Sequence, residues 1–123
     1  MKARLAMLNL FAIPKGPMPE ERVDLLARGD GLRIERIISL GHVSPPDFWY
    51  DQELDEWVVL LQGEAEIRFA DGRTKALKAG DCLFLPAGLG HRVDRTTDDP
   101  PCIWLAVHGR MTDGPWSRAT LND

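Results

Sequence analysis

Short apolar segments separated by turn residues fill the chain from residue 32 onward. Apolar and charged side chains alternate in residues 64–70, whereas residues 57–61 form a continuous apolar run. An Asp-Gly pair follows at 71–72, and such a pair is typical of the two-residue turn of a β-hairpin. Segments of strand length at this regular spacing, with no long helical period between them, predict an all-β sandwich or barrel.

The N-terminal part of the chain follows a different pattern. An apolar stretch over residues 1–13 is interrupted by Asn9 and lacks a small-residue cleavage site, which is typical of an arm rather than a secretory signal. Residues 20–29 begin with acidic residues, continue with apolar ones and end at glycine, a pattern that predicts one short helix. The expected organisation is an arm and helix over residues 1–31, a barrel over 32–110 and a C-terminal tail over 111–123.

The composition limits the classes of function. A chain of 123 residues with 44% hydrophobic content is long enough to bury one core. A formal net charge of -4, with scattered lysines and arginines, argues against a protein that binds nucleic acid. No run approaches the ~20 apolar residues that span a bilayer. Cys82 and Cys102 lie in apolar segments without a Cys-x-x-Cys pattern, which favours unpaired core residues in the reducing cytoplasm.

Two spaced patterns contain the residues that can carry chemistry. In residues 80–91 the order is Gly, five residues, Pro, one residue, Gly, two residues and His91. Upstream, Glu56 is followed after six residues by Gly63. Because alternate side chains of a strand share a face, Glu56 is expected to point inward at the start of one strand and His91 at the start of another. A carboxylate and an imidazole that converge in a cavity can form a metal site or an acid–base pair.

The same alternation predicts the neighbours of His91. Val93 and Arg95 share its face, which we expect to be the interior one, since a polar row occupies the opposite face.

Over roughly residues 32–108, these two patterns resemble the signatures of the cupin superfamily. The resemblance implies a double-stranded β-helix, that is, a jelly-roll barrel of two packed antiparallel sheets, and commonly a homodimer. It also implies that the positions of Glu56 and His91 are metal ligands.

The first signature departs from the family pattern. Cupins usually carry His-x-His before the glutamate, but Tyr50 and Gln52 stand at those places here, with Asp51 in a looser register. We predict that Gln52, Glu56 and His91 bind a divalent ion, which could be Mn, Fe, Ni or Zn. Tyr50 and Asp51 are candidate catalytic residues, because a phenol can hydrogen-bond a substrate and a carboxylate can donate oxygen ligands.

The other two histidines receive a structural interpretation. His42 lies in a loop after a glycine, and His108 ends a strand-like segment on the face of Trp104 and Ala106. We expect both to be hydrogen-bonded or surface imidazoles rather than metal ligands. Between them, His108 is the better candidate to compensate for the missing histidines, because its strand is expected to border the barrel.

Two classes of function stay open at this level. The first is a metal-dependent cupin that binds or transforms a small polar organic molecule, for example as an isomerase, a decarboxylase or, with fewer imidazoles than usual, a dioxygenase. The second is a metal-free, non-catalytic module that binds or senses a small ligand. A mutually satisfied Glu56–His91 pair without a ligand is a third interpretation. In each case we expect a cytoplasmic homodimer without a nucleic-acid or membrane partner.

Overall fold

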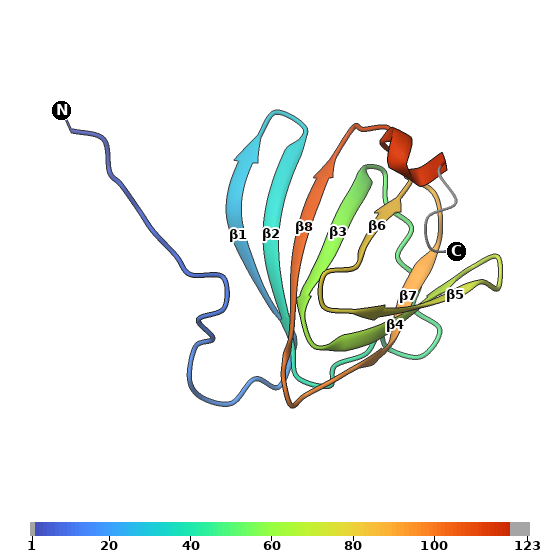
Figure 1. Cartoon of the computed structure of the whole chain (residues 1–123), viewed down its shortest axis with the longest axis horizontal. Helices are drawn as coiled ribbons and strands as arrows, with labels where there is room; N and C mark the ends of the chain where they lie inside the picture. Colours follow the sequence, from blue (N-terminus) through green and yellow to red (C-terminus); the bar gives the residue numbers. More distant parts are fainter. Residues whose placement is uncertain (1, 119–123) are drawn as a thin grey trace.

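The computed structural model describes residues 2–118, whose backbone forms two antiparallel β-sheets (Figure 1). The larger sheet has the strand order β1-β2-β8-β3-β6, and the smaller sheet has the order β5-β4-β7. This arrangement confirms the predicted all-β barrel. No helix of the described residues is long and apolar enough to cross a lipid bilayer. Of the predicted tail, residues 119–123 lie outside the described part of the chain. The elements are β1 (Arg22–Gly29), β2 (Leu32–Ser39), β3 (Asp55–Gln62), β4 (Glu64–Phe69), β5 (Thr74–Lys78), β6 (Cys82–Leu85), β7 (His91–Thr96), β8 (Cys102–Gly109) and the 3-10 helix η1 (Pro115–Arg118).

The core lies between the two sheets and is built from alternate strand residues. On β3, Glu56, Val58 and Leu60 are buried, whereas Trp57 and Val59 on the opposite face are half-buried. Successive side chains of a strand point to opposite sides of the sheet, so this alternation decides which side chains reach the interior. The buried apolar cluster consists of Val58, Leu60, Ala65, Ile67, Phe69, Leu77, Leu85, Cys102, Trp104 and Ala106.

The helix predicted for residues 20–29 is wrong, because most of this segment forms strand β1. β1 pairs with β2 along its length in an antiparallel register. Asp30 and Gly31 make the connecting turn, in which Gly31 has a φ of 64°. An Asp-Gly pair between two strands is a hairpin signal, and backbone pairing with β2 outweighs the weak intrinsic helix preference of the segment.

Gly63 carries the chain from β3 in the larger sheet to β4 in the smaller one. Its φ of 92° lies in the region that favours glycine. A Cβ at this position would lie 2.7 Å from Cys102 Sγ and 2.8 Å from Thr97 Oγ1. The absence of a side chain therefore allows the connection between the sheets to pack directly against β8.

A bulge in β7 overturns the predicted inward direction of Arg95. The register with β4 shifts by one residue between Val93 and Arg95. Because an extra residue in one strand reverses the faces beyond it, Arg95 is exposed and Thr96 is buried. His91 and Val93 precede the bulge and face the interior, as predicted.

The N-terminal arm is fastened to the outer face of the larger sheet at one place. Arg36 of β2 is buried, and its guanidinium donates hydrogen bonds to three backbone oxygens within residues 9–12 and to the carboxylate of Asp24. Ahead of this point Leu5 and Met7 are 95% and 99% exposed. The arm extends away from the barrel there (Figure 1), so the predicted packing of the arm on the barrel is limited to its later residues.

Candidate functional site

A cavity of about 310 Å³ lies between the two sheets. Strands of both sheets contribute to its walls, together with the loop before β3 and the residue that precedes β1. A cavity of this size with a few converging polar groups is typical of a binding site for a small molecule. The polar and charged side chains that line it are Glu21, Arg33, Glu35, Ser39, Tyr50, Gln52, Glu56, His91 and His108.

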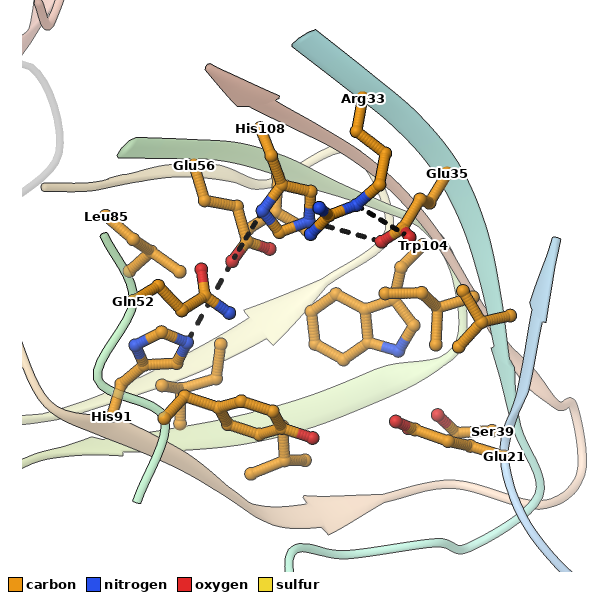
Figure 2. Close-up of a pocket in the computed structure, with 16 residues that line it drawn as sticks. Glu21, Arg33, Glu35, Ser39, Gln52, Glu56, Leu85, His91, Trp104 and His108 are labelled. Carbon is orange, nitrogen blue, oxygen red and sulfur yellow. Dashed lines mark ion pairs between the residues drawn. The ribbon is translucent and has the colours of Figure 1, made fainter. Parts of the chain in front are cut away.

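Glu56 lies between two imidazoles at the buried end of the cavity. Its Oε1 is 4.0 Å from Nε2 of His91 and 3.9 Å from Nδ1 of His108 (Figure 2). All three side chains are more than nine-tenths buried. Glu56 on β3 is the register partner of His108 on β8, whereas His91 begins β7 in the facing sheet. The predicted convergence of Glu56 and His91 is therefore observed, and His108 joins them.

Acceptor groups behind each imidazole decide which ring nitrogen faces Glu56. His91 Nδ1 lies 3.2 Å from the backbone oxygen of Leu89, which can only accept a hydrogen bond. His108 Nε2 lies 3.3 Å from Oε1 of Glu35, and Glu35 Oε2 accepts from Arg33 Nε at 2.9 Å. Each neutral ring therefore carries its proton on the outer nitrogen and turns the lone pair of the other toward Glu56.

Burial governs the protonation of this cluster. It raises the pKa of Glu56 from 4.5 to about 7, with the negative charge of Glu35 adding to the shift and Arg33 opposing it. Burial also lowers the pKa of His91 and of His108, and for His108 the positive charge of Arg33 acts in the same direction. The two rings are therefore neutral near pH 7, while Glu56 exchanges its proton in that range.

Two imidazoles and a carboxylate are donors that suit Mn, Fe, Ni or Zn. Ligands bound at about 2.1 Å to one such ion lie roughly 3 to 3.4 Å apart, so the observed separations of 3.9 and 4.0 Å are wider by about 0.5 to 1 Å. In the described part of the chain, no three His, Cys, Asp or Glu side chains already stand close enough to hold one ion. The cluster thus offers donors of the type that a divalent ion prefers, but Oε1 of Glu56 lies between the two rings, and the side chains would have to rearrange to bind one ion together.

The remaining predicted residues fall into two groups. Tyr50 and Gln52 line the cavity, and the phenol ring of Tyr50 stacks on the imidazole of His91 with centroids 5.4 Å apart. Asp51 is exposed and is not among the lining residues, as expected for a residue between two inward neighbours. Both ring nitrogens of His42 contact backbone groups, at 2.8 and 3.0 Å, which agrees with its structural interpretation. The catalytic roles of Tyr50 and Asp51 stay predictions.

Three charged residues that line the cavity were not identified from the sequence. Arg33, Glu35 and Ile37 are every second residue of β2 and share the face that lines the cavity. The sequence pattern alone did not show whether this face points into the barrel or away from it. Glu21 gave no signal, because its segment was expected to be helical. His108 was recognised as a histidine near the barrel but not as a neighbour of Glu56.

Comparison with known proteins agrees with this architecture. A family model described as "Cupin domain" matches residues 36–108. A solved structure of a proposed mannose-6-phosphate isomerase from Ralstonia eutropha JMP134 is 43% identical, with a TM-score of 0.80, and the match covers 86% of this chain and 99% of that one.

Two further relatives are more distant or share a shorter region. A cupin superfamily protein from Desulfitobacterium hafniense DCB-2 is 21% identical, with a TM-score of 0.66, over 79% of this chain and 84% of that one. The uncharacterized protein YdbB of Bacillus subtilis (strain 168) is 41% identical over 46 residues. That match covers 37% of this chain and 41% of the length of YdbB.

Proposed function

This chain belongs to the cupin domain family, and we propose that Glu56, His91 and His108 hold a divalent metal ion in its barrel. The ion would bind or activate a small polar organic molecule in the adjoining cavity. Gln52, which also lines the cavity, is the fourth candidate donor.

The convergence of three electron-rich atoms carries this proposal. Nε2 of His91 and Nδ1 of His108 each face Oε1 of Glu56, which lies between them at the buried end of the cavity. Unpaired donors of this kind repel one another in a low-dielectric interior unless a cation or a proton lies between them. Transition-metal ions satisfy carboxylate and imidazole donors together, and the acceptors behind both rings are the outer groups that metal-binding histidines commonly use.

The surrounding residues have distinct roles in this proposal. A divalent ion supplies Lewis acidity that polarises a carbonyl or hydroxyl oxygen of the bound molecule. Glu35 and the backbone oxygen of Leu89 orient the two rings. Tyr50 and Gln52 offer hydrogen bonds to the ligand, and the apolar walls limit the access of water. Chemistry on a carbonyl, an enol or a hydroxy acid, as in an isomerase or a decarboxylase, fits this arrangement.

A metal-free binding module is the second candidate, and the raised pKa of Glu56 favours it. A carboxyl group that titrates at about 7 can place its own proton between the two lone pairs near neutral pH. The cavity would then bind its ligand through hydrogen bonds alone.

Metal analysis of protein purified without a metal-affinity tag separates the two candidates. We expect about one ion per chain, and titration of chelator-treated protein with Mn²⁺ and Zn²⁺ should give one site. Glu56→Gln should weaken that site by more than ~100-fold, because removing a ligand costs more than the 10–100-fold typical of an outer-shell change. Glu53→Gln, an exposed change of the same kind, is the matched control. The absence of stoichiometric binding, or equal affinity in both variants, would support the metal-free module.

A homodimer remains part of the proposal. Leu5 and Met7 are nearly fully exposed ahead of the point, near residues 9–12, where the arm hydrogen-bonds Arg36, and β1 has an open edge. Apolar side chains on a free arm and an unpaired strand edge are both stabilised by covering them with a second copy. Sedimentation at micromolar concentration should show a dimer that deletion of residues 2–8 weakens, and a monomeric full chain would exclude it.

A further inference from the structure

Besides Glu35 and Glu56, the cavity has a third acidic group. Glu21, the residue before β1, lies beside Ser39 of β2, and the indole of Trp104 lies between this pair and Glu56 (Figure 2). Burial raises the pKa of the Glu21 carboxyl, and the neighbouring Ser39 hydroxyl opposes that shift. None of the ion pairs among residues 2–118 involves Glu21. Its carboxylate therefore lines the cavity without an ion-pair partner among these residues, and the nearby His42 only partly offsets the effect of burial on its pKa.

His42 does not form an ion pair with Glu21. Its Nδ1 lies 2.8 Å from the backbone nitrogen of Leu40, whose N–H can only donate, so this ring nitrogen carries a lone pair. The other nitrogen lies 3.0 Å from the backbone oxygen of Met18 and donates to it. Both ring nitrogens are therefore engaged by backbone groups, and neither is left to hydrogen-bond Glu21 or a ligand.

The charges along the cavity favour a cation over a phosphate. Three carboxylates line it, at Glu21, Glu35 and Glu56, against the single guanidinium of Arg33. Arg33 is already paired with Glu35 at 2.9 Å, and no lysine lines the cavity. A phosphate dianion near Glu21 would face its carboxylate without a free arginine or lysine to neutralise it.

The wall between Glu21 and Glu56 is aromatic and apolar. The side chain of Trp104 is buried and its indole ring lines the cavity, with Ile37, Val58 and Val93 among the aliphatic neighbours. The face of an indole attracts cations, and the attraction is larger for a quaternary ammonium than for a strongly hydrated ion. Aliphatic walls suit the carbon chain that would join an ammonium group to an oxygen-bearing end.

We propose that Glu21 and the indole of Trp104 bind the ammonium group of a small organic cation, whose oxygen-bearing end lies at Glu56. The position of the oxygen end rests on the proposed metal site, whereas the ammonium subsite does not depend on it. Glu21 precedes the family match over residues 36–108, whereas Trp104 lies within it, so the acidic part of the subsite comes from the N-terminal segment of this chain.

A pair of isosteric probes tests the subsite. Choline and 3,3-dimethylbutan-1-ol share a hydroxyl group and a trimethyl head, and differ in the positive charge. In calorimetric titrations of the Mn²⁺-loaded full chain, choline should bind at least about tenfold more tightly than the neutral alcohol. Glu21→Gln should reduce this preference to about twofold or less and leave binding of the alcohol unchanged. Glu20→Gln, an exposed neighbour outside the cavity, should keep the preference.

Repeating the titrations on chelator-treated protein separates this inference from the proposed function. If Mn²⁺ fails to bind but choline keeps its Glu21-dependent preference, the metal site is wrong and the ammonium subsite stands. If Mn²⁺ binds at Glu56 while choline binds no better than the alcohol, or not at all, the subsite is wrong. Tighter binding of mannose 6-phosphate than of choline would overturn it as well, as would an unchanged preference in Glu21→Gln.

Discussion

At the Glu56 end of the cavity the charged side chains are buried and held by neighbours, whereas at the Glu21 end the carboxylate is exposed to solvent. Glu56, His91 and His108 are 7%, 6% and 4% exposed and lie near the ends of strands β3, β7 and β8. Glu21 precedes β1, an edge strand on which Val23 is 50% exposed. Burying an unpaired charge destabilises the folded state, so the Glu56 end is stabilised by a bound cation or proton. At the Glu21 end, an exposed carboxylate can select between ligands with little effect on the free energy of unfolding.

The largest expected difference between the two ends is in the packing of apolar side chains. Trp104→Ala should lower the free energy of unfolding by about 3–5 kcal/mol, because it removes a buried indole from the core. Leu25→Ala on β1 should cost less than about 1 kcal/mol, because Leu25 is 50% exposed. Urea unfolding measures both values, and similar costs would contradict the division into a buried end and an open end.

The second expected effect is a dependence of stability on pH. The folded pKa of Glu56, about 7, lies above its usual value of 4.5, so the folded state binds the proton more tightly. In chelator-treated protein, this contribution is fully present below pH 4.5 and is lost as the pH rises through 7, by about 3 kcal/mol in total. His91 and His108 act oppositely, since their lowered pKa values cost stability when the pH falls below about 6.5.

Comparison of variants isolates the contribution of Glu56. Between pH 5 and pH 8, Glu56→Gln should gain stability relative to the wild type as the pH rises, and Glu53→Gln should follow the wild type. Urea unfolding at several pH values provides the measurement. Parallel curves for Glu56→Gln and the wild type would mean that Glu56 titrates normally in the folded protein.

Two turns differ in how closely they are packed, independently of the two ends of the cavity. Gly63→Ala should destabilise the protein by about 1–3 kcal/mol, because its φ of 92° disfavours a side chain and the new Cβ would press on Cys102 and Thr97. Gly31→Ala at the β1–β2 turn should cost about 1 kcal/mol or less, since no atom lies within 4 Å of the added Cβ. Thermal unfolding of both variants tests this order, and a larger loss for Gly31→Ala would reverse it.

The smallest expected effect is at Glu21. Glu21→Gln should change the free energy of unfolding by less than about 0.5 kcal/mol, because its exposed carboxylate makes no ion pair among the described residues. A larger loss in urea unfolding would show that Glu21 supports the fold rather than the selection of a ligand.

The buried end was predictable from sequence because strands alternate with a fixed period. The spacing before His91 and after Glu56 indicated the barrel, and period-two alternation was enough to point both side chains inward. That reasoning failed at Arg95, because a bulge adds a residue to β7 that leaves no mark in the hydrophobic pattern. Long-range register also decides that His108 lies opposite Glu56, and this register cannot be read from local sequence.

The open end was harder to predict because its position depends on pairing with a distant part of the sheet. Residues 20–29 contain both helix-forming and strand-forming residues, and contact with β2 decided between them. With that segment taken as a helix, Glu21 could not be assigned to the cavity. The Asp-Gly pair at 30–31 was the available signal for a hairpin.

Anomalous diffraction from crystals of the full chain grown with Zn²⁺ or Mn²⁺ tests the central claim most directly. We expect one peak per chain at the buried end of the cavity, within about 2.3 Å of Oε1 of Glu56, Nε2 of His91 and Nδ1 of His108. A cavity without such a peak, or an ion bound only by exposed carboxylates elsewhere, would contradict the account.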